Sequence, residues 1–151
     1  MKTLGNILWN FPFFGFVTAT LVLIFGVLLT ITVVAAPIGQ GLIQHGLFLY
    51  WPFGHAMVDQ KELNIPQNPA WKVYSTILMI LWIPFGIVLC LGAIVQVVGC
   101  CISLIGIPAA IVVAKSLGTF FNPVGKKCVP QAVADELERR KATEVVKAHL
   151  G

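Results

Sequence analysis

Two long stretches without a charged side chain are the feature that most limits how this chain can fold. The first lies between Lys2 and Asp59, and the second lies between Lys72 and Lys115. A helix needs roughly 20 apolar residues to cross a bilayer. Each stretch can therefore hold one spanning helix and a further length of apolar chain. Only 11% of the 151 residues are charged, which is too few to cover a soluble domain. The sequence predicts an integral membrane protein.

The first apolar stretch is too long to be a cleaved signal peptide. It covers residues 7–36, whereas the apolar region of a signal peptide has about 7 to 15 residues. A proline, Pro37, would also follow the small residues at which cleavage would occur. We therefore interpret this stretch as a retained membrane segment.

The two apolar stretches resemble each other. When residues 4–60 are compared with residues 75–131, at an offset of 71, ten of 57 pairs are identical. The proline and glycine matches are the informative ones, because these residues fix backbone conformation. They are Pro37 with Pro108, Pro52 with Pro123, Gly15 with Gly86, and Gly54 with Gly125. Weak internal symmetry is typical of membrane folds built from repeated units. The sequence thus predicts two repeats, in which these prolines and glycines are structural.

Each repeat is predicted to contain one long apolar helix. The long helices are expected at residues 7–34 and 73–103, with possible kinks at Pro12 and Pro84. About 30 residues give a helix of ~45 Å, which exceeds the ~30 Å hydrocarbon core. Both helices are therefore expected to tilt, kink or bend back.

A short helix is predicted after each long one, starting at Pro37 and Pro108, because proline is tolerated in the first helical turn. The first short helix, residues 37–51, would be only about 22 Å long. We expect both short helices to be interfacial or re-entrant. The fold class is an all-α integral membrane protein with a two-repeat membrane domain over residues 1–129.

The segment 130–151 is predicted to be a charged, soluble C-terminal helix. Asp135 with Arg139, and Glu136 with Arg140, have the i to i+4 spacing of helical ion pairs. Its four acids and four bases cancel, so the net charge of +4 does not indicate nucleic-acid binding.

Two topologies fit this pattern. If each repeat crosses once, the termini share a side with seven basic residues, the loop 55–72 lies opposite with two, and the repeats are inverted. If each apolar stretch forms a hairpin, every polar segment is cytoplasmic and the repeats are parallel. We favour the first topology; cytoplasmic termini follow from the distribution of basic residues.

Lys115 is the single charge inside apolar sequence, and an ionisable group within a membrane is a functional hypothesis by default. Alternatively, it extends from an interfacial helix to phosphate or water. The other intramembrane polar candidates are Gln40, Gln44 and His45.

Lipid headgroup anchors form a second set of candidates. A basic pair beside apolar sequence attracts anionic lipid, and aromatic residues suit the headgroup level. These residues are Lys126, Lys127, Tyr50 and Trp51. No metal site or cofactor is predicted, because the histidines lack a carboxylate cluster and the four cysteines lack zinc-ligand spacing.

The chain resembles the YccF family of small bacterial inner membrane proteins. The resemblance rests on the opening residues 5–9 (GNILW), on the repeated Pro, short helix and Pro-x-Gly elements, and on Lys115 in the second short helix. It covers about residues 5–129 and implies an inner membrane domain. It implies no mechanism.

The sequence contains no recognisable catalytic motif, so we expect no enzyme. We expect a structural or accessory membrane component, as a homo-oligomer or a subunit of a membrane complex. The alternative is an oligomeric channel or small-solute transport protein.

Overall fold

The computed structural model describes residues 2–11 and 13–151, so the kink expected at Pro12 lies outside the described residues. The chain is mostly helical, with two short strands. The elements in order are α1 (Lys2–Asn10), α2 (Gly15–Ile31), α3 (Ala36–Tyr50), β1 (His55–Asp59), α4 (Pro69–Ile102), the 3-10 turn η1 (Leu104–Gly106), α5 (Ile107–Phe121), β2 (Lys126–Pro130) and α6 (Gln131–Leu150).

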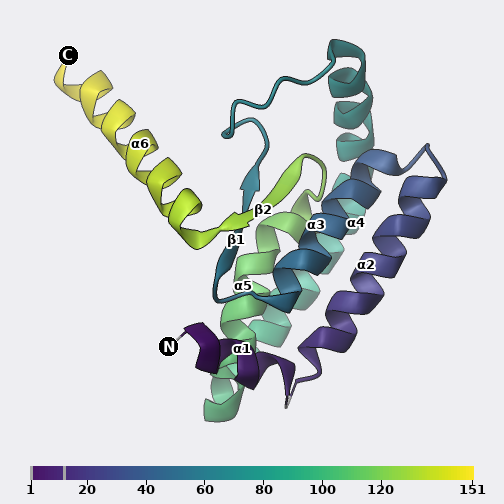
Figure 1. Ribbon diagram of the computed structural model, residues 1–151, viewed down its shortest axis with the longest axis vertical. Coiled ribbons are helices and arrows are strands. Elements are labelled where there is room, and N and C mark those ends of the chain that lie inside the picture. The colour runs from purple at the N-terminus through teal and green to yellow at the C-terminus, as the bar shows by residue number, and fades with distance from the viewer. Residues whose placement is uncertain (1, 12) are drawn as a thin grey trace.

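Two helical hairpins form the body of the molecule. Helix α2 packs against α3, and α4 packs against α5 (Figure 1). The α2–α3 turn lies at one end of the bundle, whereas the α4–α5 turn lies at the other. Helices α3 and α5 supply the most buried side chains, among them Phe48 and Val112. The core therefore lies between the short helices and the elements that cover them.

Glycines allow the first hairpin to close tightly. A Cβ atom on Gly39 would lie 2.6 Å from the backbone oxygen of Gly26, and one on Gly26 would lie 2.8 Å from the backbone nitrogen of Ile43. Small residues permit this close backbone approach between membrane helices.

Both short helices begin within one residue of their predicted starts, but the long ones differ. The first long helix is not continuous, because it is divided into α1 and α2, which are bent by 77°. Phe14 adopts a left-handed φ of 50° just before α2, and that backbone conformation cannot extend a helix. The second long helix, α4, begins at Pro69 and continues through Pro84.

The predominance of helix agrees with the all-α expectation, and the exceptions are residues 55–59 and 126–130, which form a two-stranded antiparallel sheet. Met57 lies opposite Cys128 at its centre. The N–H of Gln60 donates to the carbonyl of Gly125 at 2.7 Å, and the N–H of Gln131 donates to the carbonyl of Gly54 at 3.0 Å. The two hydrogen bonds are related by the repeat offset of 71 residues, because Gln60 corresponds to Gln131 and Gly125 corresponds to Gly54.

Helix α6 is attached to the sheet by a small apolar cluster. Ala134 is buried against Val58 and Val129, and Leu137 packs beside them. From Glu138 onward every residue of the helix is exposed, and α6 projects away from the bundle (Figure 1). The predicted C-terminal helix is therefore present, and its apolar packing is confined to its first turns.

Among the residues that the structure describes, two segments are long and apolar enough to cross a membrane. They are Pro69–Ile102 and Leu104–Phe121, and the bent pair α1 and α2 would be a third if it formed one span. Leu104–Phe121 includes the second short helix, which the sequence alone predicts as interfacial or re-entrant.

Candidate functional site

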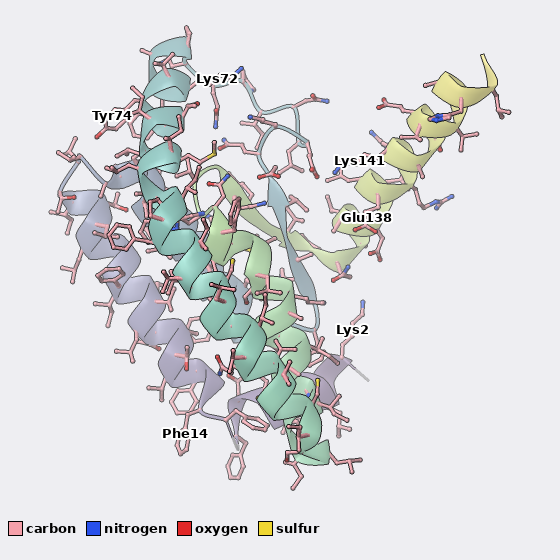
Figure 2. The ribbon with its side chains drawn as sticks, turned by 180° about the vertical axis from the view of Figure 1, so that it is seen from behind. Lys2, Phe14, Lys72, Tyr74, Glu138 and Lys141 are labelled. Carbon is pink, nitrogen blue, oxygen red and sulfur yellow. The ribbon has the colours of Figure 1, made fainter. Side chains whose placement is uncertain are left out.

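Charged and apolar side chains occupy opposite lateral sides of the bundle. We call the outward surfaces of α2 and α4 the apolar face; its exposed side chains include Phe16, Leu21, Ile24, Phe25, Leu28, Ile77, Leu81, Phe85, Val88 and Val95. We call the loop 60–68, the two strands and α6 the polar face. In Figure 2, Lys2, Glu138 and Lys141 lie on one side of the bundle and Phe14 lies on the other. The charges thus follow the length of the bundle and are not confined to its two ends.

The loop after β1 and the C-terminal helix lie together on the polar face. Lys126 pairs with Asp59 across the sheet at 3.0 Å, and Lys141 of α6 pairs with Glu62 of the loop at 2.5 Å. The topology that places the loop and the tail on opposite sides of the membrane is therefore wrong, because these segments pair directly. The hairpin alternative agrees with these contacts.

Gln44 links the first short helix to the sheet. Its side-chain oxygen accepts a hydrogen bond from the backbone N–H of Cys128 at 3.1 Å. Cys128 occupies the centre of β2, and burial raises the pKa of its thiol from 9.0 to about 11. Gln44 of α3 thus provides the hydrogen-bond acceptor for a backbone N–H of β2.

Lys115 occupies the matching position of the second short helix and also points toward the polar face. Its Nζ donates to the carbonyl of Pro52 at 3.3 Å and to Oε1 of Gln131 at 3.2 Å. Gln131 donates in turn to Asp135 at 2.8 Å. This chain of contacts joins α5 to the turn before β1 and to the start of α6. The sequence alone does not identify Gln131 and Pro52 as partners of Lys115. The match of Gln60 with Gln131 between the repeats is the signal that could have drawn attention to Gln131.

His45 is enclosed at the centre of the bundle. It is 1% exposed, stacks on Phe48 at a ring distance of 5.9 Å and meets the edge of Phe120 at 5.3 Å. Neither ring nitrogen has a hydrogen-bond partner among the described residues. Within residues 2–11 and 13–151, no three His, Cys, Asp or Glu side chains gather in a way that could hold a metal ion.

The repeated prolines and glycines lie at the ends of the short helices. Pro37 and Pro108 occupy the first turns of α3 and α5. Pro52 and Pro123 are fully buried in the turns that lead into the strands. Gly125 adopts a φ of 71°, which favours glycine, and both Gly54 and Gly125 accept the hydrogen bonds that close the sheet.

The four residues predicted as lipid anchors do not gather at one place. Tyr50 and Trp51 end α3 and precede β1, whereas Lys126 and Lys127 begin β2 and pair with the far end of β1. The Tyr50 hydroxyl is 2.7 Å from Thr20 Oγ1, and Trp51 is 57% exposed. Lys127 lines a hollow of about 440 Å³ together with Gln40 and Gln44. The lysines and the aromatic pair therefore mark opposite ends of the sheet.

Comparison with known proteins places the chain among inner membrane proteins. A family profile described as "Inner membrane component domain" (YccF) matches residues 4–55. The chain is 31% identical over 144 residues to "Inner membrane protein YccF" of Escherichia coli (strain K12), an alignment that covers 94% of this chain and 97% of that protein. The Shigella flexneri protein of the same name gives the same values. No solved structure matches.

Proposed function

Because this chain belongs to the YccF family of inner membrane proteins, we propose that it is a structural or accessory component that holds a polar platform against one surface of that membrane. In this proposal the apolar face lies in lipid and the polar face lies in water. The role is that of a binding platform, with no catalysis.

The single observation that carries the proposal is the lateral separation of charge. A charged side chain near the bilayer centre costs several kcal/mol, so the charges of a spanning bundle collect at its two ends. Here the charged loop, β2 and α6 all lie along one side (Figure 2). Exposed apolar residues on the other side extend along α4 from Val73 to Ile102. This pattern favours hairpins that enter the membrane from one surface and return.

The polar face is proposed to be cytoplasmic. Ten of the sixteen charged residues are Lys or Arg, and basic residues near membrane segments favour the cytoplasmic side. The pairing of the loop with α6 supports one compartment for both segments. Both termini belong to the same side in this arrangement, because Lys2 lies on the side of α6 in Figure 2.

The repeat architecture is part of the proposal. Met57 and Cys128 occupy the same position in the two repeats and lie opposite each other, and the hydrogen bonds of Gln60 and Gln131 are reciprocal. An antiparallel pair with this register supports an approximate two-fold axis normal to the sheet. If both hairpins enter from one membrane surface, that axis lies along the membrane normal and the repeats are parallel.

Sided cysteine labelling tests the proposal at the two turns of the hairpins. Single cysteines are placed at Val34, in the α2–α3 turn, and at Ile105, in η1, on a background without the native cysteines. Both side chains are exposed in the isolated chain and lie at opposite ends of the bundle. We expect both to be protected from an impermeant maleimide in spheroplasts and in opened membranes, whereas a cysteine at Asn64 reacts only in opened membranes.

A bundle whose helices cross the bilayer gives a different result. One of the two turns would then reach the periplasm, and its cysteine would react in intact spheroplasts. That result would refute the hairpins that enter and return from one surface, and it would favour the second candidate function.

The second candidate is an oligomeric channel or small-solute transport protein, favoured by a polar face that extends along the bundle as the wall of a lumen would. A chain of 16.4 kDa is too small to enclose a pore alone. The mass of the detergent-solubilised protein tests this reading, since a closed ring supports the channel. Lys115→Ala should then change ion flux in liposomes, and an unchanged flux would remove Lys115 from the pathway.

A further inference from the structure

A hollow of about 440 Å³ lies beneath the loop that joins β1 to α4. Helix α3, the first turns of α4 and the turn before β2 form its walls. Its volume lies within the ~300–1,000 Å³ of typical small-molecule sites. The site is therefore large enough for a phosphate with its ester substituents.

The hollow carries an excess of positive charge. Lys61, Lys72, Lys126 and Lys127 line it, against the single carboxylate of Asp59. Four lysines and one aspartate leave a formal charge of +3. Asp59 pairs with Lys126, whose side chain is only 14% exposed. The other three lysines have no acidic partner among the described residues.

The one acidic residue of the loop 60–68 is paired with a lysine outside the hollow. Glu62 follows Lys61 in the loop, and its carboxylate pairs with Lys141 of α6. Helix α6 thus neutralises the acidic group of the loop, and the +3 balance of the hollow is preserved.

Hydrogen-bonding groups surround the lysines. Lys72, Ser75 and Thr76 line the hollow from one face of α4, because residues three and four apart share a helix face. Gln40 and Gln44 line it from α3. Hydroxyl and amide groups of this kind can bind phosphate oxygens or the hydroxyls of a headgroup.

Apolar surface and aromatic side chains begin at the edge of the same hollow. Trp71 lines it, and its ring centroid is 6.1 Å from that of Tyr74. The Tyr74 hydroxyl donates to the carbonyl of Val34 in the α2–α3 turn. Val34 is 67% exposed and Val73 is 61% exposed. Aromatic residues beside exposed apolar chain are typical of the headgroup level of a membrane.

We propose that this hollow binds the phosphate headgroup of an anionic membrane lipid, with the acyl chains passing beside Trp71 and Tyr74 onto the apolar face. Basic pockets between membrane helices are suited to such headgroups. A free phosphate compound shares the chemistry of the headgroup, but it would not use the neighbouring apolar surface. The site goes beyond the proposed platform function and does not depend on how the helices are oriented in the bilayer.

Native mass spectrometry of the full chain in detergent tests the site, with phosphatidylglycerol as the probe and phosphatidylcholine as the zwitterionic comparison. The triple variant Lys61→Gln, Lys72→Gln and Lys127→Gln should weaken phosphatidylglycerol binding at least tenfold. The matched control is Arg139→Gln, Arg140→Gln and Lys147→Gln in α6, which removes the same charge from an exposed helix. Its binding should stay within twofold of the parent chain.

A second variant tests the hollow without changing charge. Thr76→Trp places a large side chain against the hollow from its α4 wall and should also weaken binding at least tenfold, with the thermal unfolding of each variant measured in parallel.

Equal losses of phosphatidylglycerol binding in the two triple variants, or equal affinity of the parent chain for the two lipids, would overturn the proposal. Glycerol phosphate and inorganic phosphate are titrated as competitors. If either displaces the lipid at an equal concentration, the site takes free phosphate and the lipid assignment is wrong.

Discussion

The two halves of the molecule make the same contact with different residues. In each half a proline turn leads into a strand and meets the short helix of the other half. The carbonyl of Pro123 approaches α3 so closely that a Cβ on Gly41 would lie 1.7 Å from its oxygen. In the other half Val112 occupies the position of Gly41, and the carbonyl of Pro52 is bound by Lys115. One contact thus depends on the absence of a side chain and the other on a long one.

The long helices differ in the same way. Trp9 lies in α1, which is bent away from α2, whereas Trp82 lies within the uninterrupted α4. Yet both indoles donate to the end of the short helix beside them: Trp9 to the carbonyl of Leu49 at 2.9 Å, and Trp82 to that of Phe120 at 3.1 Å. Leu49 and Phe120 occupy the same position in the two repeats. The contact is common to both halves although the helix that carries it is broken in only one.

The largest effect on stability is expected from Gly41→Ala, which adds a methyl group where α3 and the Pro123 carbonyl approach closely. The added methyl group would overlap the Pro123 oxygen, so α3 or the β2 turn must move. Overpacking against backbone costs about 1–3 kcal/mol and occasionally more. We expect a loss of about 3 kcal/mol, at the upper end of that range, measured as a lower unfolding temperature of the purified protein in detergent.

Gly118→Ala is the control for this substitution. It lies in α5, and a Cβ there would meet no atom within 4 Å. Replacing an interior helical glycine by alanine removes a penalty of about 1 kcal/mol, so this variant should equal or exceed the parent stability. Similar losses in the two variants would show that the Gly41 contact is not special.

A smaller effect is expected when the two indole donors are removed. Trp9→Phe and Trp82→Phe each leave a carbonyl without its partner, which costs about 1–3 kcal/mol where the group is buried. Trp9 is 7% exposed and its bond is buried, whereas the bond of Trp82 is only part-buried. Trp9→Phe should therefore lower the unfolding temperature more. The reverse order would show that the burial of these two hydrogen bonds does not set their contribution to stability.

A still smaller effect is expected at Lys115. Lys115→Gln places in the second half the residue that the first half uses at the matching position, Gln44. A glutamine can still donate to one acceptor, so the loss should stay below about 1 kcal/mol. Lys115→Leu removes every donor from Pro52 and Gln131 and should cost about 1–2 kcal/mol. Equal stabilities of the two variants would mean that these contacts contribute nothing to the fold.

Local patterns in the sequence predicted the short helices and the tail. Proline in the first turn places their starts, and the observed α3 (Ala36–Tyr50) differs by one residue at each end from the predicted range 37–51. The charge spacing after Pro130 predicts α6 equally well. These features depend on residues a few positions apart, which is the range at which capping and helical periodicity act.

The sheet could not be predicted in the same way, because its strands depend on a partner far along the chain. Residues 126–130, Lys-Lys-Cys-Val-Pro, have no clean alternation of apolar and polar side chains. Their pairing becomes favourable only when the two turns bring β1 beside β2. The contacts of Lys115 follow from that pairing, so its orientation toward the polar face was equally hidden. The match of Gln60 with Gln131 between the repeats is the one sequence feature that marks this arrangement, because both residues donate the hydrogen bonds that flank the sheet.

The smallest effect concerns the central pair of the sheet, where the first half has Met57 and the second has Cys128. Burial raises the pKa of Cys128 to about 11, so its thiol remains protonated at neutral pH and its reactive thiolate is scarce. An exposed cysteine introduced by Lys147→Cys serves as the reference, with a pKa of ~8.5.

Alkylation of the detergent-solubilised protein should therefore separate the two sites by their pH dependence. The rate at the introduced cysteine should level off above about pH 9, whereas the rate at Cys128 should keep rising toward pH 11. Because the folded pKa lies above that of the unfolded chain, the thiol should also lower the stability of the fold as pH rises through this range, since the unfolded state ionises first. Substituting Met at Cys128, as in the first half, should remove that part of the pH dependence. If the alkylation rate at Cys128 levelled off at the same pH as the rate at the reference cysteine, the centre of the sheet would be open to water. The short helices would then not exclude water from the contact between the two halves.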